Sequence, residues 1–481
     1  MRVEDMKKSP LDMNGTEKDI PDASPLETFS STVQLTENQR NEKEGLENGS
    51  GQPDKKKTSD GGALAHILKS SLGSGILAMP HAFKNGGLVF GLVATLIVGY
   101  ICTHTVHILV KSSQVLSNRV KATSLDFAET AEKAFETGPV ALRPYAHKAK
   151  LFVNVALIAT YYSVSCVYVV FIAQSAQQLV FSYLPEYKDV DLRVYMAILL
   201  VPLLVLSLPS NLKFLVPFST VANFMIVGSF VVVLYFVFTD LPSPSERTYM
   251  APVEKLPLFF STVIFAMEGI GMVLPVANDM RNPGHFLSCP GVLNIAMMIV
   301  VGLYAVIGSC GYVKYGEETA GSVTLNLPGK SILANIAKTL IPLAMLLTYG
   351  LLLYVPNDII FRAVLDKFTP FWKISFKYGL KIVVVLLSVM VAALVPNLGP
   401  IISLVGAVCV STLGLLCPAV IETVVLWDGG LGWGKWRLYK NVIIAALSLF
   451  ALVTGSYTSV LEIVYISGEV PHITNSTMSP S

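Results

Sequence analysis

The sequence predicts an all-α, polytopic membrane protein of eleven transmembrane helices, built as a five-plus-five inverted repeat with discontinuous helices 1 and 6. The first observation is composition: 53% of the 481 residues are hydrophobic and 14% are charged, whereas soluble proteins carry about 25% charged residues. The second is that apolar runs of roughly 20 residues recur along the chain, and each is long enough to cross a bilayer as a helix. The third is a Gly-x-Gly break that appears in both the first and the sixth run.

The apolar runs define the expected spans in order. They cover residues 62–83, 87–110, 150–182, 194–210, 213–239, 257–280, 290–315, 331–365, 379–396, 398–426 and 440–466. The first ten form the two five-helix halves, and the eleventh is an accessory helix. Residues 61–466 are therefore expected to form one transporter-like transmembrane domain.

The two ends of the chain differ from this domain. Residues 1–60 hold few apolar residues and many Ser, Glu, Lys and Asn, so they cannot bury enough apolar surface to offset the entropy of ordering. We expect a disordered cytosolic tail there, which is also the candidate site for a cytosolic protein partner. Residues 467–481 are expected to form a short extracellular or lumenal tail.

Lys and Arg residues set the expected orientation. With the N-terminus in the cytosol, the internal loops hold 17 of them and the outer segments hold 8, as the positive-inside rule requires. An odd number of spans then places the C-terminus outside, where Asn475 in Asn475-Ser476-Thr477 is a candidate glycosylation site. The membrane could be the cell membrane or that of the late endosome or lysosome.

Several function classes are disfavoured by the sequence. A net charge of +2 creates no strong positive electrostatic potential that would attract nucleic acid. We find no zinc-protease motif, nucleophile elbow or phosphate-binding loop, so we expect no enzyme activity, no cofactor and no metal.

The two breaks are the informative feature. Glycine and proline are costly inside a helix, and free backbone groups are tolerated at membrane depth only where they line a cavity. Such a break presents N–H groups, carbonyls and helix dipoles to a ligand, and an amino acid zwitterion suits it. The expected substrate-binding residues are Leu72, Gly73, Ser74, Gly75 and Ile76 in the first run, and Phe265, Ala266, Gly269 and Gly271 in the sixth.

Both runs resemble a known family. The stretch from Leu64 to Gly87, with His66, Gly73-Ser74-Gly75 and Pro80, is similar to the first helix of proton-coupled amino acid transporters. These are the solute carrier 36 group of the amino acid/auxin permease family, and residues 265–275 resemble its sixth helix. The resemblance implies symport of small neutral amino acids with a proton, and it assigns proton coupling to His66. Relatives are described with a disulfide between outer loops, for which this sequence has no suitable cysteines.

Ionisable residues inside the spans are the other candidates. His66 precedes Gly73 by seven residues, or about 10 Å of helix, which is too far for direct substrate contact. Its ordinary pKa near 6.5 suits a proton-driven cycle. Glu268, inside the second break, could carry the proton or cap freed amides while ionised. Asp358 is a weaker candidate for the ion path, and Asn154, Tyr161 and Tyr162 are candidates for lining the site.

We therefore predict a secondary active transporter that moves a small neutral amino acid with a proton across the lipid bilayer towards the cytosol. Two alternatives stay open. One is an amino acid-sensing receptor with little flux, and the other is a facilitative or sodium-coupled carrier.

Overall fold

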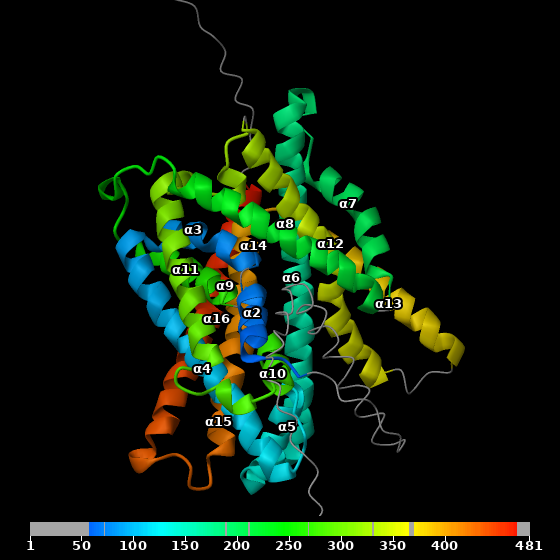
Figure 1. Ribbon diagram of the computed structural model, residues 1–481, viewed down its shortest axis with the longest axis vertical. Helices are drawn as coiled ribbons and strands as arrows, with labels where there is room; N and C mark the ends of the chain where they lie inside the picture. Colours follow the sequence, from blue (N-terminus) through cyan, green and yellow to red (C-terminus); the bar gives the residue numbers. More distant parts are fainter. Residues whose placement is uncertain are drawn as a thin grey trace, which may run out of the picture.

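The computed structural model describes residues 57–71, 73–187, 190–209, 212–267, 269–329, 331–364 and 370–468. Within these ranges the chain folds into helices (Figure 1), and extended pairing is limited to one isolated parallel bridge between Thr58 and Met280. The predicted all-α class is confirmed. Residues 1–56 of the expected tail 1–60, and residues 469–481 of the expected tail 467–481, with Asn475, lie outside the described residues.

Four helices in the N-terminal part of the chain correspond to the first three expected spans. The bounds are α2 (Asp60–Ser71), α3 (Ser74–Gly86), α4 (Leu88–Val120) and α6 (Ala146–Tyr183). The next four elements are α7 (Leu192–Ser207), α8 (Leu212–Phe238), α9 (Leu256–Ala266) and α10 (Ile270–Asp279). The expected first and sixth spans are thus each divided into two short helices, as the Gly-x-Gly pattern predicts.

The remaining helices follow in the C-terminal part. They are α11 (Val292–Tyr315), α12 (Ile332–Val364), α13 (Pro370–Leu394), α14 (Leu398–Val405), α15 (Cys417–Val425) and α16 (Trp436–Gly468). Between α14 and α15 the helix continues through two π-helical turns, Gly406–Val410 and Thr412–Leu416. A Cβ atom on Gly406 would lie 2.0 Å from the Ser261 carbonyl oxygen, so this glycine allows the π-helical segment to pack directly on α9.

Length and hydropathy agree with a membrane protein. Nine described helical segments are long and apolar enough to cross a bilayer, and α7 is a shorter apolar helix of 16 residues. The halves of the divided first span, α2 and α3, contain 12 and 13 residues, so neither spans a bilayer alone. The number of eleven spans stays a prediction.

Two groups of helices pack mainly among themselves. In one group α11 contacts α2, α3 and α4, and α3 contacts α9. In the other, α6, α7, α12 and α13 pack against one another. Figure 1 shows α2 and α10 in the middle of the molecule, between α4 and α11 on one side and α6 and α12 on the other. The divided helices therefore lie where the two groups meet.

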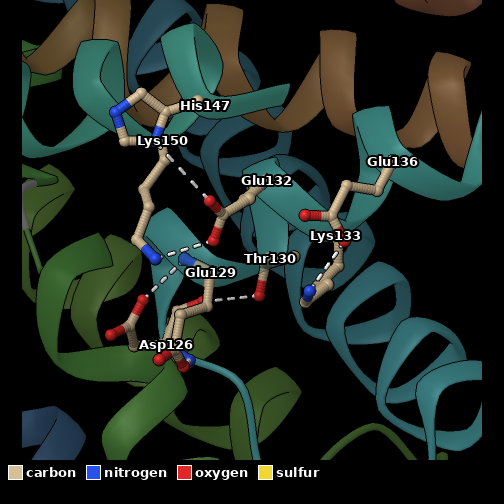
Figure 2. Close-up of polar contacts among 8 residues, drawn as sticks. All are labelled: Asp126, Glu129, Thr130, Glu132, Lys133, Glu136, His147 and Lys150. Atoms are coloured by element: carbon tan, nitrogen blue, oxygen red, sulfur yellow. Dashed lines mark hydrogen bonds and ion pairs between the residues drawn. The ribbon is translucent and has the colours of Figure 1, made fainter. Parts of the chain in front are cut away.

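A helix that does not span the membrane, α5 (Phe127–Thr137), joins α4 to α6. It begins with a capping box, in which Asp126 accepts a hydrogen bond from the Glu129 amide at 2.7 Å. The Lys150 ammonium on α6 then holds Glu132 on α5 at 2.7 Å. Figure 2 shows the capping box within α5 and the Lys150 contact that joins α5 to the first turns of α6.

Candidate functional site

The two helix breaks meet face to face. A Cβ atom added to Gly75, at the start of α3, would lie 2.7 Å from the Cα atom of Ala266, the last residue of α9. Only glycine permits this approach of backbone to backbone. Gly269, which precedes α10, has φ +156°, a conformation that strains residues with a side chain. The glycines of the motif thus bring the breaks together and shape the second one.

A cavity of about 160 Å³ lies at this meeting point. Pockets for drug-sized ligands are roughly 300–1,000 Å³, so this one suits a smaller molecule. Of the residues expected to bind substrate, those lining it are Gly73, Ser74, Gly75, Phe265, Ala266, Gly269 and Gly271. Ile76 is buried (1% exposed) but is not among the lining residues, and Leu72 lies outside the described residues.

Both helix N-termini at the cavity lack a side-chain cap. Gly73 before α3 and Gly269 before α10 provide no capping hydrogen bond. The first N–H groups of a helix have no partner within it, and they carry the positive end of the helix dipole. An anion such as a carboxylate can be bound at these two ends.

The C-terminal ends of α2 and α9 supply the opposite polarity. The carbonyl oxygens of Ser71 and Ala266 both lie within hydrogen-bonding distance of the Tyr304 hydroxyl, the latter at 2.8 Å. Tyr304 is on α11 and its side chain is 0% exposed. Its single hydroxyl proton cannot saturate four carbonyl lone pairs, so acceptor capacity remains for a donor such as an ammonium group.

The opposite wall of the cavity comes from α6 and α12. Thr160, Tyr161 and Tyr168 of α6 line it together with Leu352 of α12. A Cβ atom on Gly271 would lie 2.9 Å from the Tyr161 hydroxyl, so this hydroxyl lies directly beside the second break. The cavity is therefore enclosed by residues from both helix groups.

The other polar candidates take different positions. Tyr162 donates a hydrogen bond to Asn357 at 2.9 Å, and Asp358 forms an ion pair with Arg362 at 2.6 Å, one turn further along α12. Asn154 is not among the residues that line the cavity. Of the weaker candidates from α6, only Tyr161 lies at the breaks.

The structure describes one of the two candidates for proton coupling. His66 is buried in α2 (5% exposed) beside Ala63 and Ile67, and it does not line the cavity. Glu268 lies outside the described residues. The role of either residue in coupling stays a prediction.

Tyr304 was missed by sequence reasoning. It lies in the expected span 290–315, and the available signal was a tyrosine within an apolar run, since a buried tyrosine hydroxyl usually finds a hydrogen-bond partner. Nothing in the sequence, however, places that partner in another helix.

The end of the molecule that contains α5 is closed by a contact between the two divided helices. The Thr58 amide, just before α2, donates to the Asp279 carbonyl at 3.0 Å, and the Arg281 amide donates to the Thr58 carbonyl at 2.9 Å. The Thr58 hydroxyl also donates to the Asp279 carboxylate. Besides lining one cavity, the divided helices are thus joined at their ends.

Comparisons with known proteins agree with this arrangement. The chain is 40% identical over 407 residues to a Drosophila melanogaster protein named proton-coupled amino acid transporter-like protein pathetic, covering 85% of this chain and 86% of that one. It is 26% identical to the Caenorhabditis elegans probable amino acid transporter skat-1, over 84% and 89% of the two chains.

Among solved structures, the inward-facing conformation of Mhp1 has a TM-score of 0.52 at 12% identity, covering 86% of this chain and 92% of that one. This likeness concerns the fold. Residues 56–461 match the family described as transmembrane amino acid transporter protein. The chain belongs to that family of transmembrane amino acid transporters.

Proposed function

We propose that this protein is a secondary active transporter that carries a small neutral amino acid together with a proton towards the cytosol. The observation that carries the proposal is the meeting of two helix breaks at one cavity. Two uncapped N-termini there suit the substrate carboxylate, and the carbonyls of Ser71 and Ala266 suit its ammonium group. The small volume, about 160 Å³, favours a small side chain.

The arrangement of helices supports alternating access. The cavity is lined by the divided helices on one side and by α6 and α12 on the other, and these belong to groups that pack mainly among themselves. Rocking one group against the other exposes such a site to each side of the membrane in turn. The name of the Drosophila relative and the position of His66 support a proton as the coupled ion.

The first test is uptake of radiolabelled alanine, glycine and proline into proteoliposomes, at about pH 5.5 and about pH 7.5 outside, on either side of the ordinary histidine pKa. We expect uptake to rise with the inward proton gradient. We expect His66→Ala to lose that response while still binding amino acid. His147→Ala is the matched control, because the His147 side chain is 86% exposed, at the start of α6.

Each contrary outcome points to one alternative. Binding without flux at either pH would favour an amino acid sensor, and a ligand-dependent partner of the N-terminal tail would then be sought. Uptake that ignores the proton gradient would favour a facilitative or sodium-coupled carrier.

The orientation has its own test. With the N-terminus in the cytosol, Asn475 faces the lumen during synthesis, and we expect a glycan there. Treatment with an N-glycosidase should shift the protein on a gel, and Asn475→Gln should abolish the shift. The N-terminal tail holds two further sequons, Asn14-Gly15-Thr16 and Asn48-Gly49-Ser50. A shift that instead requires Asn14 or Asn48 would show that the N-terminus faces the lumen.

A further inference from the structure

A second cavity, of about 310 Å³, lies apart from the breaks, between α4, α11, α15 and the start of α16. Basic side chains from two of these helices line it: His104, His107 and Lys111 of α4, with Arg437 and Lys440 of α16. None of these five residues lines the cavity at the helix breaks, so substrate binding there does not account for their clustering.

The charge of this basic cavity is not balanced by its own residues. Glu422 of α15 is the acidic residue that lines it, and its carboxylate is bound by the Lys440 ammonium at 2.7 Å. Lys111 and Arg437 remain without a carboxylate among the lining residues. The Nε2 atom of His104 is also buried without a hydrogen-bond partner among the described residues. A buried polar atom of this kind calls for a partner that the described chain does not supply.

Aromatic side chains place the basic cavity at the level of the membrane surface. Exposed tryptophans follow α15 and begin α16: Trp427, Trp433 and Trp436 are 48%, 97% and 53% exposed. Tryptophan and tyrosine gather where hydrocarbon meets headgroups. The cavity is lined by residues of α15, and α15 and α5 lie at the same end of the molecule (Figure 1), which we expect to face the cytosol.

The cavity adjoins a face of α4 suited to acyl chains. Val93, Ile97 and Tyr100 are 52%, 55% and 73% exposed, and their spacing puts them on one side of the helix. Tyr100 also lines the cavity and stacks on His104, with ring centroids 6.4 Å apart. An apolar stripe running from the basic cavity towards the bilayer centre fits a lipid better than a soluble anion.

We propose that this basic cavity binds the headgroup of an anionic phospholipid carrying a phosphate monoester, with the acyl chains along the exposed stripe of α4. Lys111 and Arg437 supply charge to the phosphate, and His104 Nε2 donates a hydrogen bond to it. Basic pockets between helices on the cytosolic side are suited to such headgroups, because the cytosolic leaflet holds the anionic lipids.

The test measures binding of dioctanoyl phosphatidylinositol phosphate to the purified full-length protein by native mass spectrometry. Each basic residue near a membrane surface contributes about 1 kcal/mol, so we expect Lys111→Gln to weaken binding about fivefold. His104→Phe keeps the stacking on Tyr100 but removes Nε2, and it should also weaken binding about fivefold. Lys148→Gln, an exposed lysine on α6 outside the cavity, should bind as the wild type does.

Three results would overturn the proposal. One is unchanged binding in both cavity variants when gel filtration shows them to be folded. Another is equal weakening by Lys148→Gln, which would indicate non-specific surface charge. The third is inositol bisphosphate, the soluble headgroup, binding as tightly as the lipid, because the apolar stripe would then contribute nothing. Dioctanoyl phosphatidylcholine should bind more weakly than the anionic probe to the wild type.

Discussion

At the scale of single residues, Tyr304 connects the two breaks. Its hydroxyl lies within hydrogen-bonding distance of the last carbonyl oxygen of α2 and that of α9, so one side chain from α11 holds the C-terminal ends of both half-helices in register. The geometry of the proposed ammonium site depends on that register, because the same two carbonyls would accept hydrogen bonds from the substrate.

Tyr304→Phe should therefore weaken amino acid binding about fivefold. The substitution keeps the volume of the ring but removes the hydrogen bonding, worth about 1 kcal/mol, that holds the two helix ends in register for the ammonium group, and each 1.4 kcal/mol is a factor of ten. The measurement is substrate affinity from binding to purified protein. Tyr312→Phe on the same helix is the control, since the Tyr312 hydroxyl bonds Glu317 at 2.9 Å. If both variants bind alike, Tyr304 does not position the site.

At the scale of elements, each divided helix is a pair of short helices joined by glycine. Gly75 allows α3 to touch α9, and Gly406 allows the π-helical segment to pack on the same helix. The substitution of a side chain at either position requires a backbone to move. These close contacts explain how helices too short to span a bilayer alone can be held in place.

The short helix α5 has polar contacts (Figure 2) in addition to a buried apolar face. Asp126→Ala removes the N-cap acceptor, which costs about 1 kcal/mol. We expect faster hydrogen exchange across residues 127–137 with little change in the transmembrane helices. Asp126→Asn should restore protection, because asparagine caps equally well. Glu136→Ala should have little effect, since its pair with Lys133 is solvent-exposed, and exposed ion pairs contribute little to stability. If all three variants exchange hydrogen as slowly as the wild type across residues 127–137, packing alone orders α5.

At the scale of the whole molecule, the breaks form part of the boundary between the two helix groups. The contact between Thr58 and residues 279–281 joins α2 to α10, and α10 also packs on α2 and α4. The contact therefore lies within one helix group and should stay closed while that group rocks against the other.

A cross-link across this contact should leave transport intact. Residues paired in adjacent strands lie about 4.8 Å apart, within the range a disulfide can bridge, so Thr58→Cys with Met280→Cys should form one on oxidation. We expect the oxidised variant to take up amino acid as the wild type does. Ser113→Cys with Thr130→Cys is the control for a disulfide elsewhere in the protein, because those hydroxyls, on α4 and α5, are 3.2 Å apart. Loss of uptake on oxidation that returns on reduction, in the Thr58 and Met280 variant alone, would show that α2 and α10 must separate.

The sequence by itself determined the all-α membrane class, the approximate bounds of the apolar helices and the two breaks. These features are local: the length of an apolar run and the cost of Gly and Pro within it are properties of neighbouring residues. The breaks could thus be placed at Gly73–Gly75 and Gly269–Gly271 before any contact was known. The exact bounds are less local. The helix α4 ends after the expected residue 110, and α13 begins before the expected residue 379, because polar residues continue a helix past its apolar part.

Only the tertiary structure decided which residues from distant helices meet those breaks. Tyr304 and Tyr161 join them from α11 and α6, whereas Tyr162 and Asp358, equally polar in the sequence, turn to Asn357 and Arg362. Whether a polar side chain within a span faces the cavity or a neighbouring helix depends on the rotation and packing of whole helices. The hydropathy of a single segment does not encode that rotation.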